Sequence, residues 1–246
     1  MRWTWMAAAA CACACGGDKP DYLADTGWEP PQGDSAVDSG SSVPPVPVEV
    51  TARLLDPISS RGLSELAVSD VQGAASCTTD ADGECSLSVT GSSSFHLSVT
   101  GDNVLEHRLF GPAGAEDFTT ISFIANARLT DQVYSLLRVS RDSTKGTVVV
   151  GLDRPNLSPA TGASAAIDGS ADVTFVFGAS LPEAGDTLVA GGSSIVTFVN
   201  VPPGPVTVTA TGAEDTTCLA APARTDAAHT VESVAGAVSV VTFICE

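Results

Sequence analysis

Short runs of alternating apolar and polar residues mark the chain from about residue 47 onward. A clear run is Phe95-His96-Leu97-Ser98-Val99, in which every second side chain is apolar. In an extended strand these side chains fall on one face. Such runs, rich in Val and Thr and separated by Gly, Asp, Asn and Pro, predict β-strands joined by turns. An all-β fold is therefore expected.

One strand–turn–strand pattern occurs twice. Residues 86–101 align without a gap on residues 197–212, and each residue number is higher by 111 in the second copy. Apolar side chains occupy the same alternating positions in both copies. The matched positions are Leu87 with Phe198, Phe95 with Val206, Leu97 with Val208 and Val99 with Ala210. A repeat of about this length indicates one sandwich domain per copy.

The repeat predicts two β-sandwich domains, at residues 47–114 and 146–246. Seven strands, the usual number for a sandwich, are expected in the second domain. They are predicted near residues 146–153, 162–168, 173–177, 195–200, 205–211, 229–234 and 237–244. The connecting residues 115–145 match neither copy and are expected to bridge the domains.

A short helix is predicted within this bridging segment. Thr130 is a residue type that favours helix N-caps, and an amphipathic stretch follows it. The helix is therefore expected from Asp131 to Arg138. Its apolar side is predicted to consist of Val133, Tyr134, Leu136 and Leu137.

Two stretches resemble the carboxypeptidase regulatory-like domain, a transthyretin-like sandwich. Thr79-Asp80-Ala81-Asp82-Gly83 is similar to the family's Thr-Asp-x-x-Gly turn. Gly204-Pro205-Val206-Thr207-Val208 is similar to its closing strand, with Val206 in place of the family's aromatic residue. The resemblance implies two transthyretin-like or Ig-like sandwiches with a supporting role. Domains of this family normally lack catalytic residues, so none is carried over.

The first fifteen residues have the layout of a secretory signal, with one positive charge before a short apolar stretch. The junction Ala14-Cys15-Gly16 resembles the acylation site of bacterial lipoproteins, in which a small residue precedes the lipidated cysteine. Ala12 stands where that family prefers leucine. The resemblance implies lipidation at Cys15, with Cys11 and Cys13 as alternative acceptors. A plain signal peptide is the remaining interpretation.

Residues 16–46 are predicted to be a linker. They contain six carboxylates and one lysine, are rich in Gly, Pro and Ser, and have no hydrophobic period. This composition predicts a disordered, extended spacer. Together with the lipid anchor, it implies an exported protein that is attached to the bacterial outer membrane or cell surface.

Four further cysteines lie in the two domains. An even number of cysteines in an exported chain indicates disulfides, and four cysteines allow three connectivities. Cys77 and Cys85 are the favoured first pair because they flank a hairpin turn. Cys218 and Cys245 then form the second pair, which attaches the last strand to an earlier one. A metal site is disfavoured because the chain has no Cys-x-x-Cys spacing.

The net charge of −18 narrows the range of partners. An acidic surface repels phosphate backbones, so no nucleic acid partner is expected. The expected partners are a membrane, reached through the lipid anchor, and an unidentified protein or envelope component. No cofactor-binding motif is evident, so no cofactor is expected.

No catalytic constellation stands out, so the chain is not expected to be an enzyme. The three histidines, His96, His107 and His229, are isolated in the sequence. His96 alternates with apolar neighbours and is expected on the outer face of its strand. No Gly-x-Ser-x-Gly motif and no Gly-rich phosphate loop with lysine is present.

One acidic turn is a candidate calcium site. Asp80-Ala81-Asp82-Gly83-Glu84 resembles the opening of a calcium loop, and Asp80 and Asp82 are the candidate ligands. The twelfth position of that loop is Gly91, which cannot supply the bidentate carboxylate that such a loop needs. A simple turn is therefore the favoured interpretation, and no metal is expected.

These features together predict a non-catalytic, surface-tethered lipoprotein that binds or scaffolds other components of the cell envelope. The alternative is a carbohydrate-binding accessory module. Sugar faces stack on aromatic side chains, but Trp3, Trp5 and Trp28 all lie outside the two domains.

Overall fold

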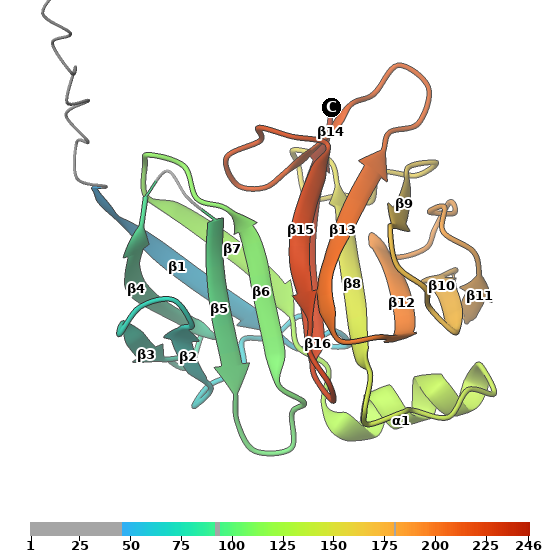
Figure 1. Cartoon of the computed structure of the whole chain (residues 1–246), viewed down its shortest axis with the longest axis horizontal. Helices are drawn as coiled ribbons and strands as arrows, with labels where there is room; N and C mark the ends of the chain where they lie inside the picture. Colours follow the sequence, from blue (N-terminus) through green and yellow to red (C-terminus); the bar gives the residue numbers. More distant parts are fainter. Residues whose placement is uncertain (1–45, 92–93, 180) are drawn as a thin grey trace, which may run out of the picture. The chain divides into compact units, whose positions relative to one another are not determined.

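The computed structural model describes residues 46–91, 94–179 and 181–246. These residues form sixteen β-strands and the short helix α1 (Figure 1). The predicted all-β sandwich fold with one short helix is therefore confirmed. The seven strands predicted between residues 146 and 246 are all present, with ends within two residues of the prediction, and β11 (Pro182–Ala184) and β14 (Cys218–Ala220) are additional.

The first sandwich consists of two sheets around one core. One sheet has the order β4-β1-β7, in which β1 pairs antiparallel with β4 and parallel with β7. The other contains the order β6-β5-β2-β3. The strands are β1 (Pro47–Leu55), β2 (Ala67–Asp70), β3 (Ser76–Thr78), β4 (Glu84–Thr90), β5 (Ser94–Thr100), β6 (His107–Pro112) and β7 (Phe118–Phe123). Both sheets contribute to the core, for example through Leu54 and Leu97.

The second sandwich is built in the same way. One sheet has the order β11-β10-β12-β8-β16, with β14 added to β16, and the other has the order β15-β13-β9. The remaining strands are β8 (Gly146–Asp153), β9 (Ser164–Ile167), β10 (Val173–Phe177), β12 (Ile195–Val201), β13 (Gly204–Thr211), β15 (Ala228–Ser233) and β16 (Val238–Cys245). Leu152, Val208 and Phe243 lie in its core and are fully buried.

The internal repeat extends to the topology. Strands β4 and β12 have bounds that differ by 111 at both ends, as the sequence alignment requires. The order β4-β1-β7 in the first sandwich corresponds to β12-β8-β16 in the second, and β6-β5-β2 corresponds to β15-β13-β9. In both copies the first strand pairs parallel with the last. The two sandwiches are therefore two copies of one strand arrangement.

Strand β7 lies in the segment 115–145, where the sequence analysis predicted a helix but no strand. Its six residues pair with β1, so the sheet of the first sandwich extends to Phe123. The strand escapes a pattern search because two of its core-facing positions, Thr120 and Ser122, are polar. The complete set of domain boundaries remains a prediction.

The two sandwiches share one continuous sheet. Strand β6 of the first pairs parallel with β16 of the second, with His107 opposite Val238 and Phe110 opposite Val241. The Val238 amide donates a hydrogen bond to the Glu106 carbonyl at 2.8 Å. The Phe110 side chain belongs to the core of the second sandwich. We call this β6–β16 contact the joint.

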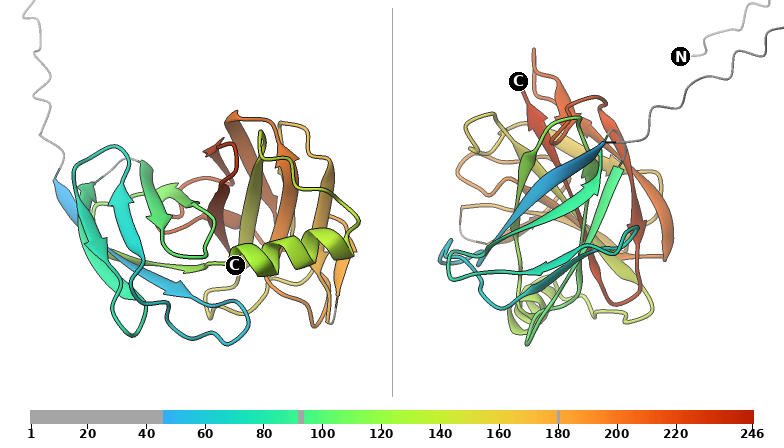
Figure 2. Two further views of the ribbon diagram at one scale, coloured as in Figure 1. Left: turned by 90° about the horizontal axis from the view of Figure 1, so that it is seen from below. Right: turned by 90° about the vertical axis from the view of Figure 1, so that its left-hand side faces the viewer.

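Helix α1 (Ala127–Leu136) begins four residues earlier than predicted. Asn126, not Thr130, is its N-cap, because the Asn126 side chain accepts a hydrogen bond from the Leu129 amide at 2.8 Å. Tyr134 is buried against Phe175 and Val199, on the outer side of β10 and β12 (Figure 2). Leu136, predicted on the apolar side, is 61% exposed. Among the described residues, no helix is long and apolar enough to cross a membrane.

Candidate functional site

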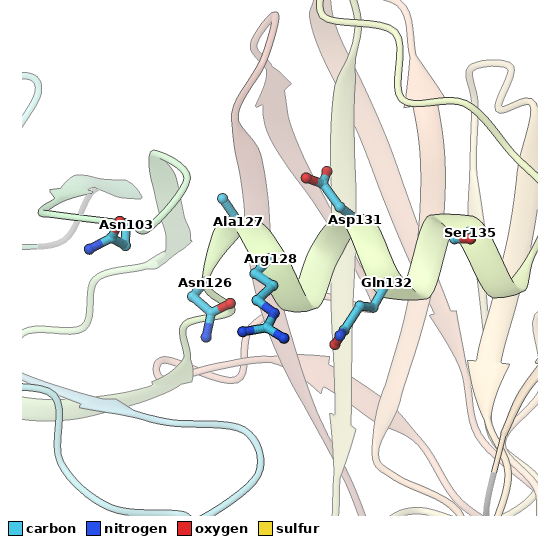
Figure 3. Close-up of a pocket in the computed structure, with 7 residues that line it drawn as sticks. All are labelled: Asn103, Asn126, Ala127, Arg128, Asp131, Gln132 and Ser135. Atoms are coloured by element: carbon cyan, nitrogen blue, oxygen red, sulfur yellow. The ribbon is translucent and has the colours of Figure 1, made fainter.

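An open groove lies along α1. Its volume is about 700 Å³, and it begins at the Asn126 cap (Figure 3). The turn between β5 and β6 contributes Asn103 to its wall. The lining residues are Asn103, Asn126, Ala127, Arg128, Asp131, Gln132 and Ser135.

The groove offers hydrogen-bonding groups of both signs. In Figure 3 the side chains of Asn126, Arg128 and Gln132 extend from the same side of the helix, and Asp131 extends from the other. Asp131 lies 4.0 Å from Arg141. The lining contains no histidine or cysteine that would pair with Ser135 as nucleophile and base. The groove is therefore a polar surface that presents amide, guanidinium and carboxylate groups.

A buried polar layer lies beside the joint. His96 was expected on the outer face of its strand, exposed to solvent, but it is only 7% exposed, so this prediction is wrong. Its ring stacks on Phe110 with ring centroids 4.2 Å apart. The outer face of β5 is covered because β6 carries the second sandwich on its free edge. Burial, and next the charge of Arg108, lower the pKa of His96.

Glu106 organises the rest of this layer. It forms an ion pair with Arg108 at 2.6 Å and accepts a hydrogen bond from the Ser98 hydroxyl at 3.0 Å. The Arg108 Nε and the His96 Nε2 are buried without a hydrogen-bond partner among the described residues. Two buried polar atoms without a partner in one layer are a cost of closing the joint. His96 and Ser98 of this layer are buried, whereas the Arg108 and Glu106 side chains are 19% and 35% exposed.

His107 is the most strongly shifted histidine. It is 2% exposed, and its Nδ1 lies 2.8 Å from the Leu105 carbonyl. Desolvation lowers the pKa of His107 to about 4, and the bond to Leu105 opposes this shift. The ring is therefore neutral at pH 7 and acts as a core side chain.

The stability of the protein is expected to depend on pH through His107. The unfolded chain protonates this ring near pH 6.5, whereas the folded chain protonates it only near pH 4. The stability contributed by the neutral ring is present above pH 6.5 and is lost as the pH falls toward 4. We expect a loss of about 3 kcal/mol across this window. Urea unfolding followed by circular dichroism at several pH values measures it.

His107→Asn is the matched variant, because its amide can still donate to the Leu105 carbonyl but does not titrate. The burial of Asp153 raises its pKa to about 6, and this group acts with the opposite sign in the same window. The quantity to compare is therefore the difference in the free energy of unfolding between wild type and variant at each pH. An unchanged difference from pH 7 to pH 4 contradicts the prediction.

Asn200 is a structural centre that the sequence analysis missed. It is 3% exposed, and its Nδ2 donates to the Ser140 carbonyl and to Asp172, both at 3.0 Å. Its Oδ1 accepts the Asp142 amide, and Lys145 forms an ion pair with Asp172 at 3.1 Å. These bonds fasten the connection between α1 and β8 to β12. The sequence signal that could have revealed this role is an amide residue within the apolar run of β12.

Both predicted disulfides are present. Cys77 in β3 is bonded to Cys85 in β4, which links the two facing sheets of the first sandwich. Cys218 in β14 is bonded to Cys245 in β16, and the two residues are direct partners in that ladder. Each sandwich therefore carries one disulfide.

In the acidic turn, the Asp80 carboxylate is hydrogen-bonded to backbone amides of the same turn. The Asp80 carboxylate accepts hydrogen bonds from the amides of Asp82 and Glu84, at 2.9 and 3.0 Å. In the residues that the structure describes, no group of three or more His, Cys, Asp or Glu residues is arranged to hold a metal ion. The geometry at this turn is that of a carboxylate-capped turn.

The predicted lipidation site lies outside the described residues. Cys15, its alternatives Cys11 and Cys13, and residues 16–45 of the predicted linker all precede the first described residue, Val46. The same is true of all three tryptophans. Lipidation therefore stays a prediction.

Comparisons with known proteins give little further information. No family model and no curated protein matches the chain. Among the solved structures with distant similarity are three pilins. The minor pilin of Streptococcus agalactiae is 9% identical over 80% of this chain and 95% of its own, with a TM-score of 0.28. A streptococcal ancillary pilin is 10% identical over 81% and 69%, with a TM-score of 0.29. The shaft pilin of Lactobacillus rhamnosus GG is 12% identical over 82% and 98%, with a TM-score of 0.25. TM-scores of this size do not establish a common fold, so no conclusion about this chain rests on these pilins.

Proposed function

We propose that this protein is an exported, non-catalytic scaffold, lipid-anchored through Cys15 to the bacterial outer membrane or cell surface. Residues 16–46 act as the spacer, and the two sandwiches form the body that other envelope components contact. We further propose that both sandwiches are of the carboxypeptidase regulatory-like type. The Thr79-Asp80-x-x-Gly83 turn is the described feature that supports this relation.

The observation that carries the proposal is the continuous sheet through both sandwiches. Flexibly linked domains move independently, whereas the joint ties these two through backbone hydrogen bonds and through Phe110 in the second core. Two directly joined domains suit a scaffold, which holds its partners at fixed positions. The two disulfides support an oxidising location outside the cytoplasm.

The chemistry of the described polar sites agrees with a role that involves no reaction. His96 and His107 are buried at the joint, and the Asp80 carboxylate is bonded to backbone amides. The groove along α1 supplies amide, guanidinium and carboxylate groups at an open surface. These are groups for contact with a polar partner.

The anchor is tested by expressing the full chain in a bacterium with a radiolabelled or alkyne-tagged fatty acid. Wild type should carry the label and sediment with the membranes. Cys15→Ser should lose the label and appear in the soluble fraction, because a soluble body without acyl chains has no affinity for the bilayer. The measurement is the labelled fraction and the membrane-bound fraction of the protein.

Cys11→Ser and Cys13→Ser are the matched controls and should behave as wild type. Persistent labelling of Cys15→Ser would show that Cys11 or Cys13 is the lipidated cysteine. Absence of label on the wild type overturns the anchor. Exposure at the cell surface is read from protease digestion of intact cells, and complete protection of the wild type contradicts a surface role.

A further inference from the structure

Part of the sheet that runs through both sandwiches lies between two covers. A row of directly paired residues crosses this sheet, and their side chains share one face. The row consists of Leu97, Leu109, Val240, Val149, Thr197 and Phe175. Its first two members lie in the core of the first sandwich, and Phe175 at the other end packs against Tyr134 of α1. Val240 and Val149, between these covers, are partly exposed.

The next row along the strands extends this partly exposed area. Thr242 follows Val240 on the same face of β16, is partly exposed and is paired with Gly151 of β8. We call Val149, Gly151, Val240 and Thr242 the strip. None of the four is charged, and the opposite face of their two strands is covered by β13 and β15 (Figure 1). The strip is thus an uncharged area on a sheet whose other face is closed.

Strand β7 lies beside the strip in the facing sheet. In the order β4-β1-β7, β4 is disulfide-bonded to β3, which is the far end of the sheet that contains the strip. β7 is therefore at the near end, towards β16. Phe118 of β7 and Val240 of the strip pack against the same core. A strand added to the outer side of β7 would therefore lie over β16 and β8.

The outer edge of β7 is open among the described residues. The Ile124 amide donates to the Leu55 carbonyl, so the backbone groups of residues 119, 121 and 123 face away from β1. These groups have no hydrogen-bond partner in the described part of the chain. Charge, proline or a bulge protects most natural edge strands from a new neighbour. β7 contains no charged residue and no proline, and its pairing with β1 is continuous.

The space beyond β7 suits one strand and not a folded sheet. Neighbouring strands lie about 4.8 Å apart, so the strip, which spans two strands, is about 10 Å wide. Beyond it, α1 packs on Phe175 and Val199. The edge strand of a folded sandwich would bring its own neighbouring strands into the place of α1. A single extended segment avoids this collision, which argues against a second folded copy as the occupant.

From these observations we propose that the β7 edge and the strip bind one extended, basic peptide segment of a partner protein. The segment pairs through its backbone with residues 119, 121 and 123, and every second side chain lies on the strip. β-branched side chains match the Val and Thr residues of the strip. The inference goes beyond the proposed function and does not depend on the lipid anchor.

The charge of the chain determines the charge of the segment. The net charge is −18, and acidic residues flank the two strands involved. Glu116 and Asp117 directly precede β7, and Asp153 ends β8 on the face that carries the strip. Side chains of the segment that point away from the strip are therefore expected to be lysine or arginine.

The test is the binding of a fluorescently labelled peptide of four Val-Lys repeats to the full chain, measured by fluorescence anisotropy. Cys11, Cys13 and Cys15 are replaced by serine, so that neither lipid nor free thiols interfere. Saturable binding is expected at protein concentrations up to about 1 mM. A peptide of four Val-Glu repeats should not bind, because the acidic chain repels it.

Two N-methylated peptides separate strand pairing from simple charge attraction. One carries a methyl group on every valine amide and the other on every lysine amide, and both keep the charge of the parent peptide. Only alternate amides of an extended segment face β7. One of the two peptides should therefore lose affinity about tenfold or more, and the other should bind like the parent.

Variants of the chain test the edge and the strip separately. Thr119→Pro removes an outward amide of β7 and should lower the affinity about tenfold, whereas Thr119→Val keeps this amide and is the matched control. Val149→Lys places a charge beneath the peptide and should also weaken binding, whereas Val149→Thr should bind like wild type. Circular dichroism and thermal unfolding establish that each variant is folded. If Thr119→Pro does not fold, Thr119→Lys replaces it, because its charge repels the peptide and its amide keeps the ladder intact.

Three results would overturn the proposal. The first is the absence of saturable binding, and the second is equal binding of both N-methylated peptides, which would indicate charge attraction alone. The third is undiminished binding by the folded Thr119→Pro and Val149→Lys variants, which would place the peptide elsewhere. Light scattering of the chain without peptide adds a further check: a dimer that Thr119→Pro abolishes would assign the edge to a second copy and contradict a peptide partner.

Discussion

Replacing Phe243 with alanine is expected to lower the free energy of unfolding by about 3–5 kcal/mol. The side chain is fully buried in the core of the second sandwich. It lies on β16, and at Phe243 this strand pairs with β8 on one side and with β14 on the other. A strand held on both sides cannot shift to fill the cavity, so the cost should be near the upper end of this range. Urea unfolding followed by circular dichroism measures it.

Phe123→Ala is the matched control. Phe123 lies on β7, the strand that corresponds to β16 in the first sandwich, but its side chain is 39% exposed. The same chemical change should cost about 1 kcal/mol or less there. Equal losses at both positions contradict the assignment of Phe243 to the core. A loss confined to Phe123 contradicts the burial of Phe243 and the exposure of Phe123.

Removing the Cys218–Cys245 disulfide is expected to cost about 3–4 kcal/mol. The bond closes a loop with a sequence separation of 27, and it attaches β14 to β16. In the double variant Cys218→Ala, Cys245→Ala the unfolded chain regains the freedom of this loop, and two buried sulfur atoms are lost. The measurement is again the midpoint and slope of urea unfolding.

The other disulfide supplies the comparison. Cys77 and Cys85 have a sequence separation of only 8, and both are partly exposed. Loop closure predicts a smaller cost of about 2–3 kcal/mol for the variant Cys77→Ala, Cys85→Ala. The order of the two losses is the informative result, because it tests the contribution of loop length. A larger loss in the first sandwich would reverse the prediction.

The fold of each sandwich was predictable because its signals are local. Alternation located β4, β5, β12 and β13, and the constant offset between the copies exposed the repeat. The Cys77–Cys85 pair followed from residues that flank a turn, and Cys218 and Cys245 then formed the second pair. Each of these inferences uses neighbours in the sequence or a comparison of the chain with itself.

The joint was not predictable by the same means. The pairing of β6 with β16 joins residues more than a hundred positions apart, and neither strand shows a local sign of its partner. This pairing also explains why the alternation misplaced His96. A strand covered on both faces usually reads as a continuous apolar run, but β5 carries the polar residues His96 and Ser98 on its second covered face and so reads like a strand with one face in water. β7 was missed for a related reason, since Thr120 and Ser122 face the core without being apolar.

The helix start shows a further limit of pattern reading. Both Asn126 and Thr130 are residue types that cap helices, and both precede an amphipathic stretch. The structure uses Asn126, and the Thr130 hydroxyl instead bonds to the Asn126 carbonyl from within the helix, at 3.1 Å. Two acceptable caps one turn apart cannot be ranked without the tertiary contacts of Tyr134.

The place of β16 in the sheet has a consequence for folding during synthesis. β16 is the last strand in the sequence, and it lies between β8 of its own sandwich and β6 of the other. Until residues 238–245 have been made, β8 lacks its parallel neighbour, the second core lacks Phe243, and β6 has a bare edge. Contacts between such distant residues form slowly. The second sandwich should therefore remain incompletely folded during synthesis until β16 emerges.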